Sequence, residues 1–235
     1  METAVIIAGG RGERLKPLTD EIPKTLLPLG GKPILYWIVK WLKSFGVKKL
    51  VIGVAYKKEL IRSFFEQNSN FDIDVQFSEH SVEGGTAEGF KKAIKFVKDE
   101  NFVAMNSDEL TNMNLENLWQ KHIQSGLSVT MALSYYNAKL SVVKIDQNDR
   151  VISIEYGRKI KEILVSIGIY IFNKSVIEQI PEVGSIEDTL FPFLSSNRQL
   201  GSYILSKNEE WVTVNNLKEL NEASIAIEKW GKSNA

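Results

Sequence analysis

The first half of the chain alternates short apolar segments with amphipathic ones. Candidate strands occupy residues 4–7, 50–55, 73–77 and 102–105, and candidate helices occupy residues 34–45, 59–67, 87–97 and 115–124. Alternation of this kind is typical of βαβ units that build a parallel sheet. We therefore predict an α/β fold with a Rossmann-like, doubly wound sheet that is mixed but mostly parallel.

The sequence pattern changes after residue 128. Strand-like runs follow closely at 128–134, 142–145, 151–155 and 164–172, and a helix at 187–194, a strand at 202–205 and a helix at 217–227 come after them. Asn148 and Asp149 predict a tight turn between two of these strands. We expect this half to complete the sheet and cover one of its ends.

A glycine-rich loop follows the first strand directly. Gly9, Gly10 and Gly12 fall within four residues, so backbone N–H groups there can approach a phosphate chain with no Cβ in the way. Arg14 and Lys24 add positive charge to the same loop. This combination predicts that the loop binds a polyanion.

Two common phosphate-binding motifs do not fit the loop. A dinucleotide fingerprint needs a third glycine where Leu15 stands, and Pro17 would break the helix that should begin there. This disfavours a Rossmann dehydrogenase. A Walker A loop fails as well, because the Gly31-Lys32 pair is followed by Pro33 instead of Ser or Thr.

Composition limits the partners that the chain can have. The 235 residues carry 29 basic and 29 acidic side chains, no cysteine, and no apolar stretch of 18 residues. We predict a cytoplasmic protein that binds neither nucleic acid nor membranes and that has no disulfides or thiolate metal sites.

The glycine loop resembles the first motif of the sugar-1-phosphate nucleotidyltransferases, also called NDP-sugar pyrophosphorylases. That motif is G-G-x-G-x-R-L-x-P-L-T-x-x-x-P-K-x-L-x-P, and every fixed position is present between Gly9 and Pro28. Weaker similarity extends to about Ala223, and the length is closest to mannose- and heptose-1-phosphate guanylyltransferases. The resemblance implies a single nucleotidyltransferase domain over residues 1–235, without the C-terminal β-helix that some members carry.

The resemblance also implies roles for particular residues. Residues 1–127 would bind the nucleotide and residues 128–235 the sugar phosphate. The catalytic residues would be Arg14, Lys24 and Asp108, and the nucleotide would contact Ala8, Gly9, Gly10, Gly12, Gly85 and Thr86. The sugar phosphate would contact Lys24, Gly168 and Arg158.

Asp108 aligns with the aspartate that holds the catalytic Mg²⁺ in the family, although Ser107 replaces the usual glycine before it. The alternative is that Asp108 only caps a turn. The loop at 84–89 resembles the element that reads the base. Thr86 there predicts a helix N-cap with free N–H groups, and Glu88 stands where a small residue is usual.

The second half departs from the family pattern. Thr213 stands where the family has a second metal-binding aspartate, Tyr156 and Gly157 replace a Glu-Lys pair, and Leu140 and Ser141 replace a Tyr-Gly pair. One interpretation is an unusual sugar phosphate, bound by Arg158 or Lys159. The other is a homologue that binds nucleotide or sugar phosphate as a regulatory subunit without catalysing the reaction.

The remaining titratable candidates carry little information. His122 lies on a predicted helix and is interpreted as structural, and His80 is a loop histidine with no evident partner. Glu79 and Glu83 receive no role. The resemblance implies attack of a sugar 1-phosphate on the α-phosphorus of an NTP, and the general preference for two-fold symmetry predicts a homodimer.

Overall fold

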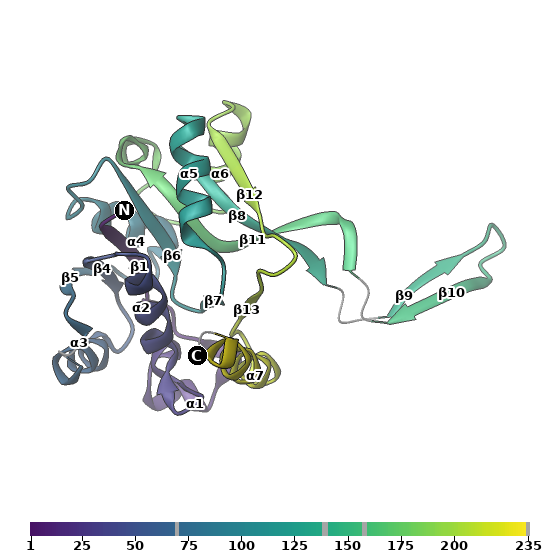
Figure 1. Ribbon diagram of the computed structural model, residues 1–235, viewed down its shortest axis with the longest axis horizontal. Helices are drawn as coiled ribbons and strands as arrows, with labels where there is room; N and C mark the ends of the chain where they lie inside the picture. Colours follow the sequence, from purple (N-terminus) through teal and green to yellow (C-terminus); the bar gives the residue numbers. More distant parts are fainter. Residues whose placement is uncertain (69–70, 138–140, 157–158, 234–235) are drawn as a thin grey trace.

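The computed structural model describes residues 1–68, 71–137, 141–156 and 159–233. Its centre is a seven-stranded sheet with the strand order β12-β8-β11-β6-β1-β4-β5. Of its strands only β11 (Lys159–Asn173) runs antiparallel to its neighbours β6 (Asn101–Asn106) and β8 (Val129–Asn137). The predicted α/β class and mostly parallel sheet are therefore confirmed (Figure 1).

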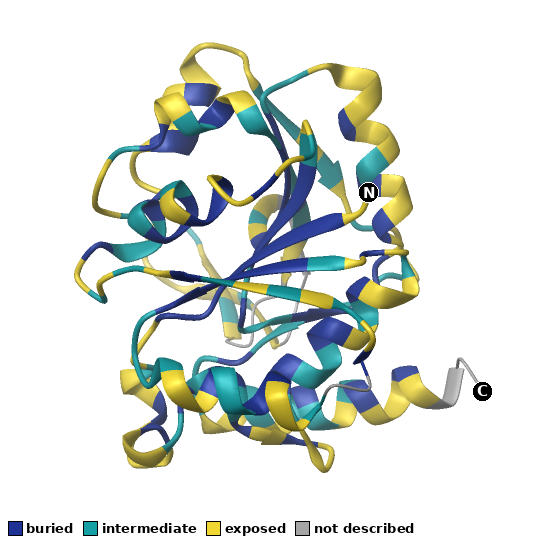
Figure 2. Cartoon of the chain, turned by 90° about the vertical axis from the view of Figure 1, so that its left-hand side faces the viewer, coloured by how far each residue is buried: buried dark blue, intermediate teal, exposed yellow. Residues whose placement is uncertain are grey.

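The parallel part of the sheet forms from the apolar runs of the first half. Its strands are β6, β1 (Thr3–Ile7), β4 (Lys49–Val54) and β5 (Asp74–Glu79), and β12 (Leu200–Ile204) adds a parallel edge beside β8. Figure 2 shows these central strands as the most continuously buried part of the chain.

Helices cover both faces of the sheet because side chains alternate along each strand. Ala4 and Ile6 point into a first cluster of buried hydrophobic side chains, on one face of the sheet. Val5 and Ile7 point into a second such cluster, on the opposite face. The first cluster is covered by α2 (Ile34–Ser44), α3 (Lys58–Gln67), α5 (Leu115–Ser125) and α7 (Leu217–Ser233), and the second by α4 (Gly85–Ile94) and α6 (Leu190–Ser196).

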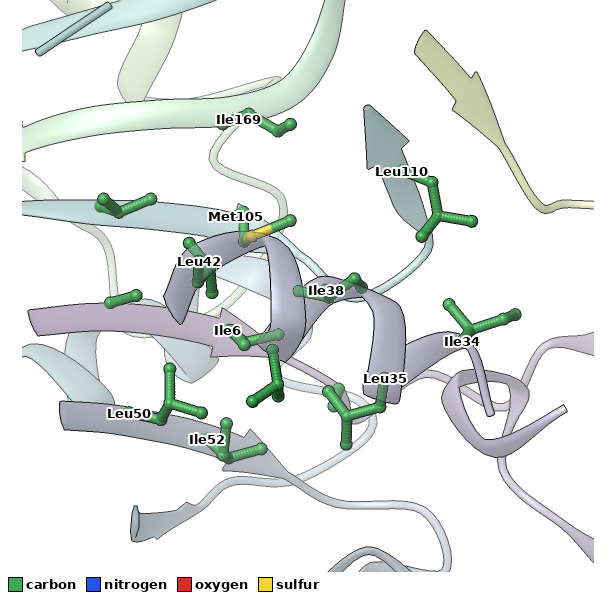
Figure 3. Close-up of a cluster of buried hydrophobic side chains, with 14 of the residues drawn as sticks. Ile6, Ile34, Leu35, Ile38, Leu42, Leu50, Ile52, Met105, Leu110 and Ile169 are labelled. Carbon is green, nitrogen blue, oxygen red and sulfur yellow. The ribbon is translucent and has the colours of Figure 1, made fainter. Parts of the chain in front are cut away.

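The apolar side of α2 places five buried side chains in the first cluster: Ile34, Leu35, Ile38, Val39 and Leu42. Leu35, Ile38 and Leu42 recur at helical spacing, and all three are at most 1% exposed. Figure 3 shows them packed over Ile6, Leu50 and Ile52 of the sheet. This packing holds the first strand and the loop after it in place.

Small elements that the sequence pattern does not predict complete the fold. They are β2 (Pro28–Leu29), β3 (Lys32–Pro33), β7 (Glu109–Thr111), β13 (Trp211–Thr213), α1 (Leu18–Glu21) and the 3-10 helices η1 (Glu13–Leu15), η2 (Lys24–Leu26) and η4 (Lys174–Gln179). The helix predicted at 187–194 begins later, at Leu190, because Ser185 binds the backbone N–H groups of Glu187 and Asp188 in a turn.

The strands β9 (Ser141–Ile145) and β10 (Val151–Tyr156) pair only with each other among the described strands. Figure 1 shows this hairpin extending away from the main sheet. The predicted turn is confirmed: Asp149 has a φ of 59°, and its N–H donates to the carbonyl of Asp146. Tyr156 is 74% exposed at the end of the hairpin.

Replacing Ile6 with alanine should lower the free energy of unfolding by about 2–5 kcal/mol, because Ile6 is fully buried in the central strand and a cavity would remain. Urea unfolding followed by tryptophan fluorescence measures this. Val183→Ala is the control. Since Val183 is 64% exposed, it should cost less than about 0.5 kcal/mol. Equal losses in both variants would contradict the assigned core.

Candidate active site

The glycine loop occupies the carboxyl end of β1, where ligands bind in open α/β sheets. Gly12 adopts a φ of 64°, which favours glycine, and Thr19 donates its hydroxyl hydrogen to the Gly12 carbonyl. A Cβ at Gly10 would meet nothing within 4 Å. The loop is therefore folded by its own contacts and open at Gly10.

His80 lies behind the loop. A Cβ at Gly9 would come within 2.4 Å of the imidazole Cε1 and 2.9 Å of the Ala55 Cβ. Gly53 and Gly89 also face this ring. His80 Nδ1 donates to the Ser81 carbonyl at 2.9 Å. The sequence showed no partner for His80, and its packing behind the glycine loop appears only in the structure.

The structure brings the three predicted catalytic residues together. Lys24 Nζ contacts Asp108 Oδ2 across 84 positions of sequence, and both side chains are largely buried. Arg14 donates to the side-chain oxygen of Asn215 at 2.9 Å, and Lys24 Nζ lies 3.4 Å from the same atom. Asn215 thus joins both cations of the loop, although the sequence reading assigned it no role.

Asn215 reaches this position through the pairing of β7 with β13. Thr213 is opposite Glu109 in that antiparallel ladder, and the N–H of Val214 donates to the carbonyl of Asp108. The side chain of Asn215 then donates to the Thr213 hydroxyl at 2.9 Å. The segment that follows β13 is consequently bound to Asp108, between β6 and β7.

Glu109 is an acid of the site with a raised pKa. Burial, together with the neighbouring charge of Asp108, holds the pKa of its carboxyl well above the ordinary value, although hydrogen bonds from Trp211 and Thr213 and the charge of Lys24 act in the opposite direction. The sequence analysis named Asp108 and assigned no role to Glu109, whose contacts with Trp211 and Thr213 come from residues more than 100 positions away.

The loop before α4 differs from its predicted form. Thr86 is not the N-cap, which is Gly84. The Thr86 hydroxyl instead donates to Glu187 and accepts from the N–H of Ile186. The Ala87 N–H donates to the Gly184 carbonyl, so this group is not free for a ligand. Folding brings the distant segment around residue 185 onto this helix end, which sequence spacing does not reveal.

Glu88, which stands where the family has a small residue, fastens the same loop. It accepts from the Ser81 N–H and hydroxyl and pairs with Lys92. These contacts, led by Lys92, lower the pKa of Glu88 to about 2. A Cβ at Gly84 would lie 1.6 Å from its carboxylate, which explains the glycine.

The other predicted residues have varied surroundings. Gly168 has a φ of 68° and faces the Glu109 side chain, at an irregular point of β11. Arg158, Gly157 and Leu140 lie outside the described residues. His122 is buried and bonded to Thr130 and Asn101, consistent with its structural interpretation. Glu79 pairs with Lys58 and Arg62, and Glu83 lies 3.7 Å from Arg11.

The arrangement brings the open side of the loop at Gly10 together with two cations and an acid at one end of the sheet. A family model described as Nucleotidyl transferase matches residues 3–229. The chain belongs to the nucleotidyl transferase family. This confirms the predicted family and the prediction of an enzyme, a nucleotidyltransferase. Members of this family generally use a divalent metal ion.

The nucleotidyltransferase is 33% identical over 175 residues to a D-glycero-alpha-D-manno-heptose 1-phosphate guanylyltransferase of Campylobacter jejuni, covering 74% of this chain and 76% of the relative. It is 27% identical over 196 residues to a mannose-1-phosphate guanylyltransferase of Mycobacterium tuberculosis, covering 81% of this chain but only 55% of the relative. The crystal structure of HddC from Yersinia pseudotuberculosis superposes with a TM-score of 0.76 at 22% identity, covering 97% and 100% of the two chains, which shows the shared fold.

Two negative observations apply to the described residues. No helix among them is long and apolar enough to span a membrane. No group of three or more His, Cys, Asp or Glu side chains among them could hold a metal ion, so a metal at this site would also need other oxygen donors or ligand phosphates.

Valine at Gly9 and valine at Gly10 should behave differently. Gly9→Val forces a Cβ against His80 and Ala55 and should destabilise the fold by about 1–3 kcal/mol. Gly10→Val should leave the melting temperature unchanged, because the space around Gly10 is open, but it should weaken nucleotide binding by blocking the approach of phosphate. Thermal unfolding and calorimetry with NTPs separate the two effects. Unweakened nucleotide binding by Gly10→Val would exclude this loop as the phosphate site.

Proposed function

We propose that the chain joins an NTP and a sugar 1-phosphate into an NDP-sugar and releases pyrophosphate. The observation that carries this proposal is the convergence of Arg14, Lys24 and Asp108 at the open glycine loop. The reported relatives are named as enzymes that act on sugar 1-phosphates, which favours catalysis over a regulatory homologue that only binds.

The finer substrate assignment is a guanylyl transfer to a heptose- or mannose-1-phosphate. The Campylobacter relative, with the highest identity among those reported, supports the heptose, and it is matched over three quarters of its own length. The Mycobacterium relative supports the same base. The residues that replace the family's sugar-site pairs, Tyr156 with Gly157 and Leu140 with Ser141, fit an unusual sugar phosphate.

The reaction needs positioning and charge neutralisation more than acid–base chemistry. An oxygen of the sugar phosphate attacks the α-phosphorus, a new P–O bond forms, and the bond to the β-phosphate breaks. Pyrophosphate leaves with the electron pair. The nucleophile is already an anion, so no side chain must take a proton from it.

Each charged residue has a distinct task in this proposal. Arg14 lies next to the glycine loop and would neutralise charge on the leaving pyrophosphate. Lys24 is held between Asp108 and Asn215, where its ammonium would bind the sugar phosphate and the α-phosphate together. The N–H groups from Gly9 to Gly12 would hold the β- and γ-phosphates, while that of Ala8 donates to the Gly53 carbonyl. Gly85 and Thr86 would lie at the base.

The donor set at the end of β6 fits a hard divalent cation, which we propose to be Mg²⁺. Asp108 contacts Lys24 through Oδ2 alone, and its Oδ1 has no hydrogen bond among the described residues. The side-chain oxygen of Asn106 is buried there without a partner among them. Oxygen ligands of these kinds suit Mg²⁺. When bound, the ion would polarise the α-phosphate and offset its negative charge.

Three further expectations remain predictions. These are a homodimer, a cytoplasmic location, and the division of the domain into a nucleotide-binding half up to residue 127 and a sugar-phosphate half after it. Gly168 and Arg158 likewise stay predicted contacts of the sugar phosphate.

Lys24→Ala and Arg14→Ala should each lower kcat/KM by about 10²–10³, because each removes a charge that faces the transferred phosphates. Pyrophosphate release by the wild-type protein, measured with four NTPs and a panel of sugar 1-phosphates in the presence of Mg²⁺, identifies the substrates. The same assay with those substrates then measures the fall in kcat/KM of each variant. Lys32→Ala, which removes a lysine that lies over Tyr36, is the matched control and should change little.

A loss below about threefold in either variant would remove that residue from the mechanism. If the wild-type protein bound NTPs but released no pyrophosphate with any sugar 1-phosphate, the regulatory alternative would replace the proposed function.

A further inference from the structure

Glu109 has an unusual environment for a carboxylate. It is only partly exposed, and its Oε2 accepts from the Trp211 indole at 2.6 Å while its Oε1 accepts from the Thr213 hydroxyl at 3.3 Å. Both donors are neutral, and Glu109 forms no ion pair with any described residue. A carboxylate withdrawn from water beside a second one, Asp108, is unfavourable unless a cation compensates for it.

A second, independent observation lies at the same place. The Asn106 side-chain oxygen is buried and has no hydrogen-bond partner in the part of the chain that the structure describes. A Cβ added at Gly168 would lie 3.2 Å from Asn106 Nδ2 and 3.2 Å from Glu109 Oε1. The amide and the carboxylate therefore meet the same point of β11, where any other residue would displace them.

The ladder between β7 and β13 gives Glu109 a specific relation to Thr213. The two residues are direct partners in that ladder, and their side chains are in contact. A carboxylate on either residue would consequently lie close to the same point of the site. In this chain the acid is on β7 and the neutral hydroxyl is on β13.

We propose that Glu109 is the second carboxylate of the cation site and binds the divalent ion together with Asp108. The identity of that ion as the cofactor of nucleotidyl transfer rests on the proposed function. The binding itself does not, since it depends only on the oxygen donors of Asp108, Glu109 and Asn106.

The test measures Mn²⁺ binding by electron paramagnetic resonance, without nucleotide or sugar phosphate. Mn²⁺ takes the same oxygen ligands as Mg²⁺ and is visible directly. Glu109→Gln should weaken Mn²⁺ binding at least tenfold. A glutamine keeps the shape and can still accept from Trp211 and donate to Thr213, so the fold should survive. Glu59→Gln is the control, because the Glu59 side chain is 74% exposed on α3, and it should bind as the wild type does.

The variant Thr213→Asp tests the same site in a second way, with Glu109 left in place. It adds a carboxylate beside Glu109, so it should tighten Mn²⁺ binding at least threefold and increase the rise in melting temperature that Mn²⁺ causes. Asp108→Asn should weaken binding as Glu109→Gln does.

Two results would overturn the proposal. One is unchanged Mn²⁺ affinity in both Glu109→Gln and Thr213→Asp, which would leave Glu109 as an anchor for Trp211 and Thr213 only. The other is a folded wild-type protein that binds no Mn²⁺ even at millimolar concentration. Neither result depends on turnover, so failure of this site and failure of the proposed reaction can be told apart.

Discussion

The contact between Lys24 and Asp108 holds the candidate site together. Lys24 follows the glycine loop, and Asp108 follows the central strand β6, so this one ion pair joins two segments that leave the same end of the sheet. Both side chains are largely shielded from water, where a charge needs a partner. A phosphate that entered the site would compete with Asp108 for the lysine.

The C-terminal segment completes this arrangement. The Asn215 side chain accepts from Arg14, lies near Lys24 and donates to Thr213, which in turn contacts Glu109. A chain of polar contacts thus runs from the glycine loop to the first residue of β7. Such networks fix the positions of charged groups when each member has a partner. Glu109, at the end of this chain of contacts, accepts only from neutral donors, and the nearby Asn106 oxygen has no partner among the described residues, so these are the groups to which we propose that a cation binds.

The sequence by itself determined the class of fold and singled out the glycine loop. Apolar runs with strand spacing and amphipathic runs with helical spacing gave the central strands and α2 to α5 nearly at their observed bounds, because burial on both faces of a sheet requires those patterns. The loop was recognisable because glycines and cations close in sequence are also close in space. Residues such as Arg14 and Lys24 could therefore be named before the fold was known.

Only the tertiary structure decided what distant segments do to one another. The short ladder of β7 with β13 has three residues on each strand, too few to show a period, yet it sets the position of Asn215 and places Thr213 against Glu109. Thr86 was misjudged as a cap because its partners lie about 100 residues away, and the support that His80 gives to the loop depends on glycines from three separate elements. The spacing of apolar residues indicates which side of an element is buried. It does not indicate which side chain from a distant part of the sequence will contact a given residue.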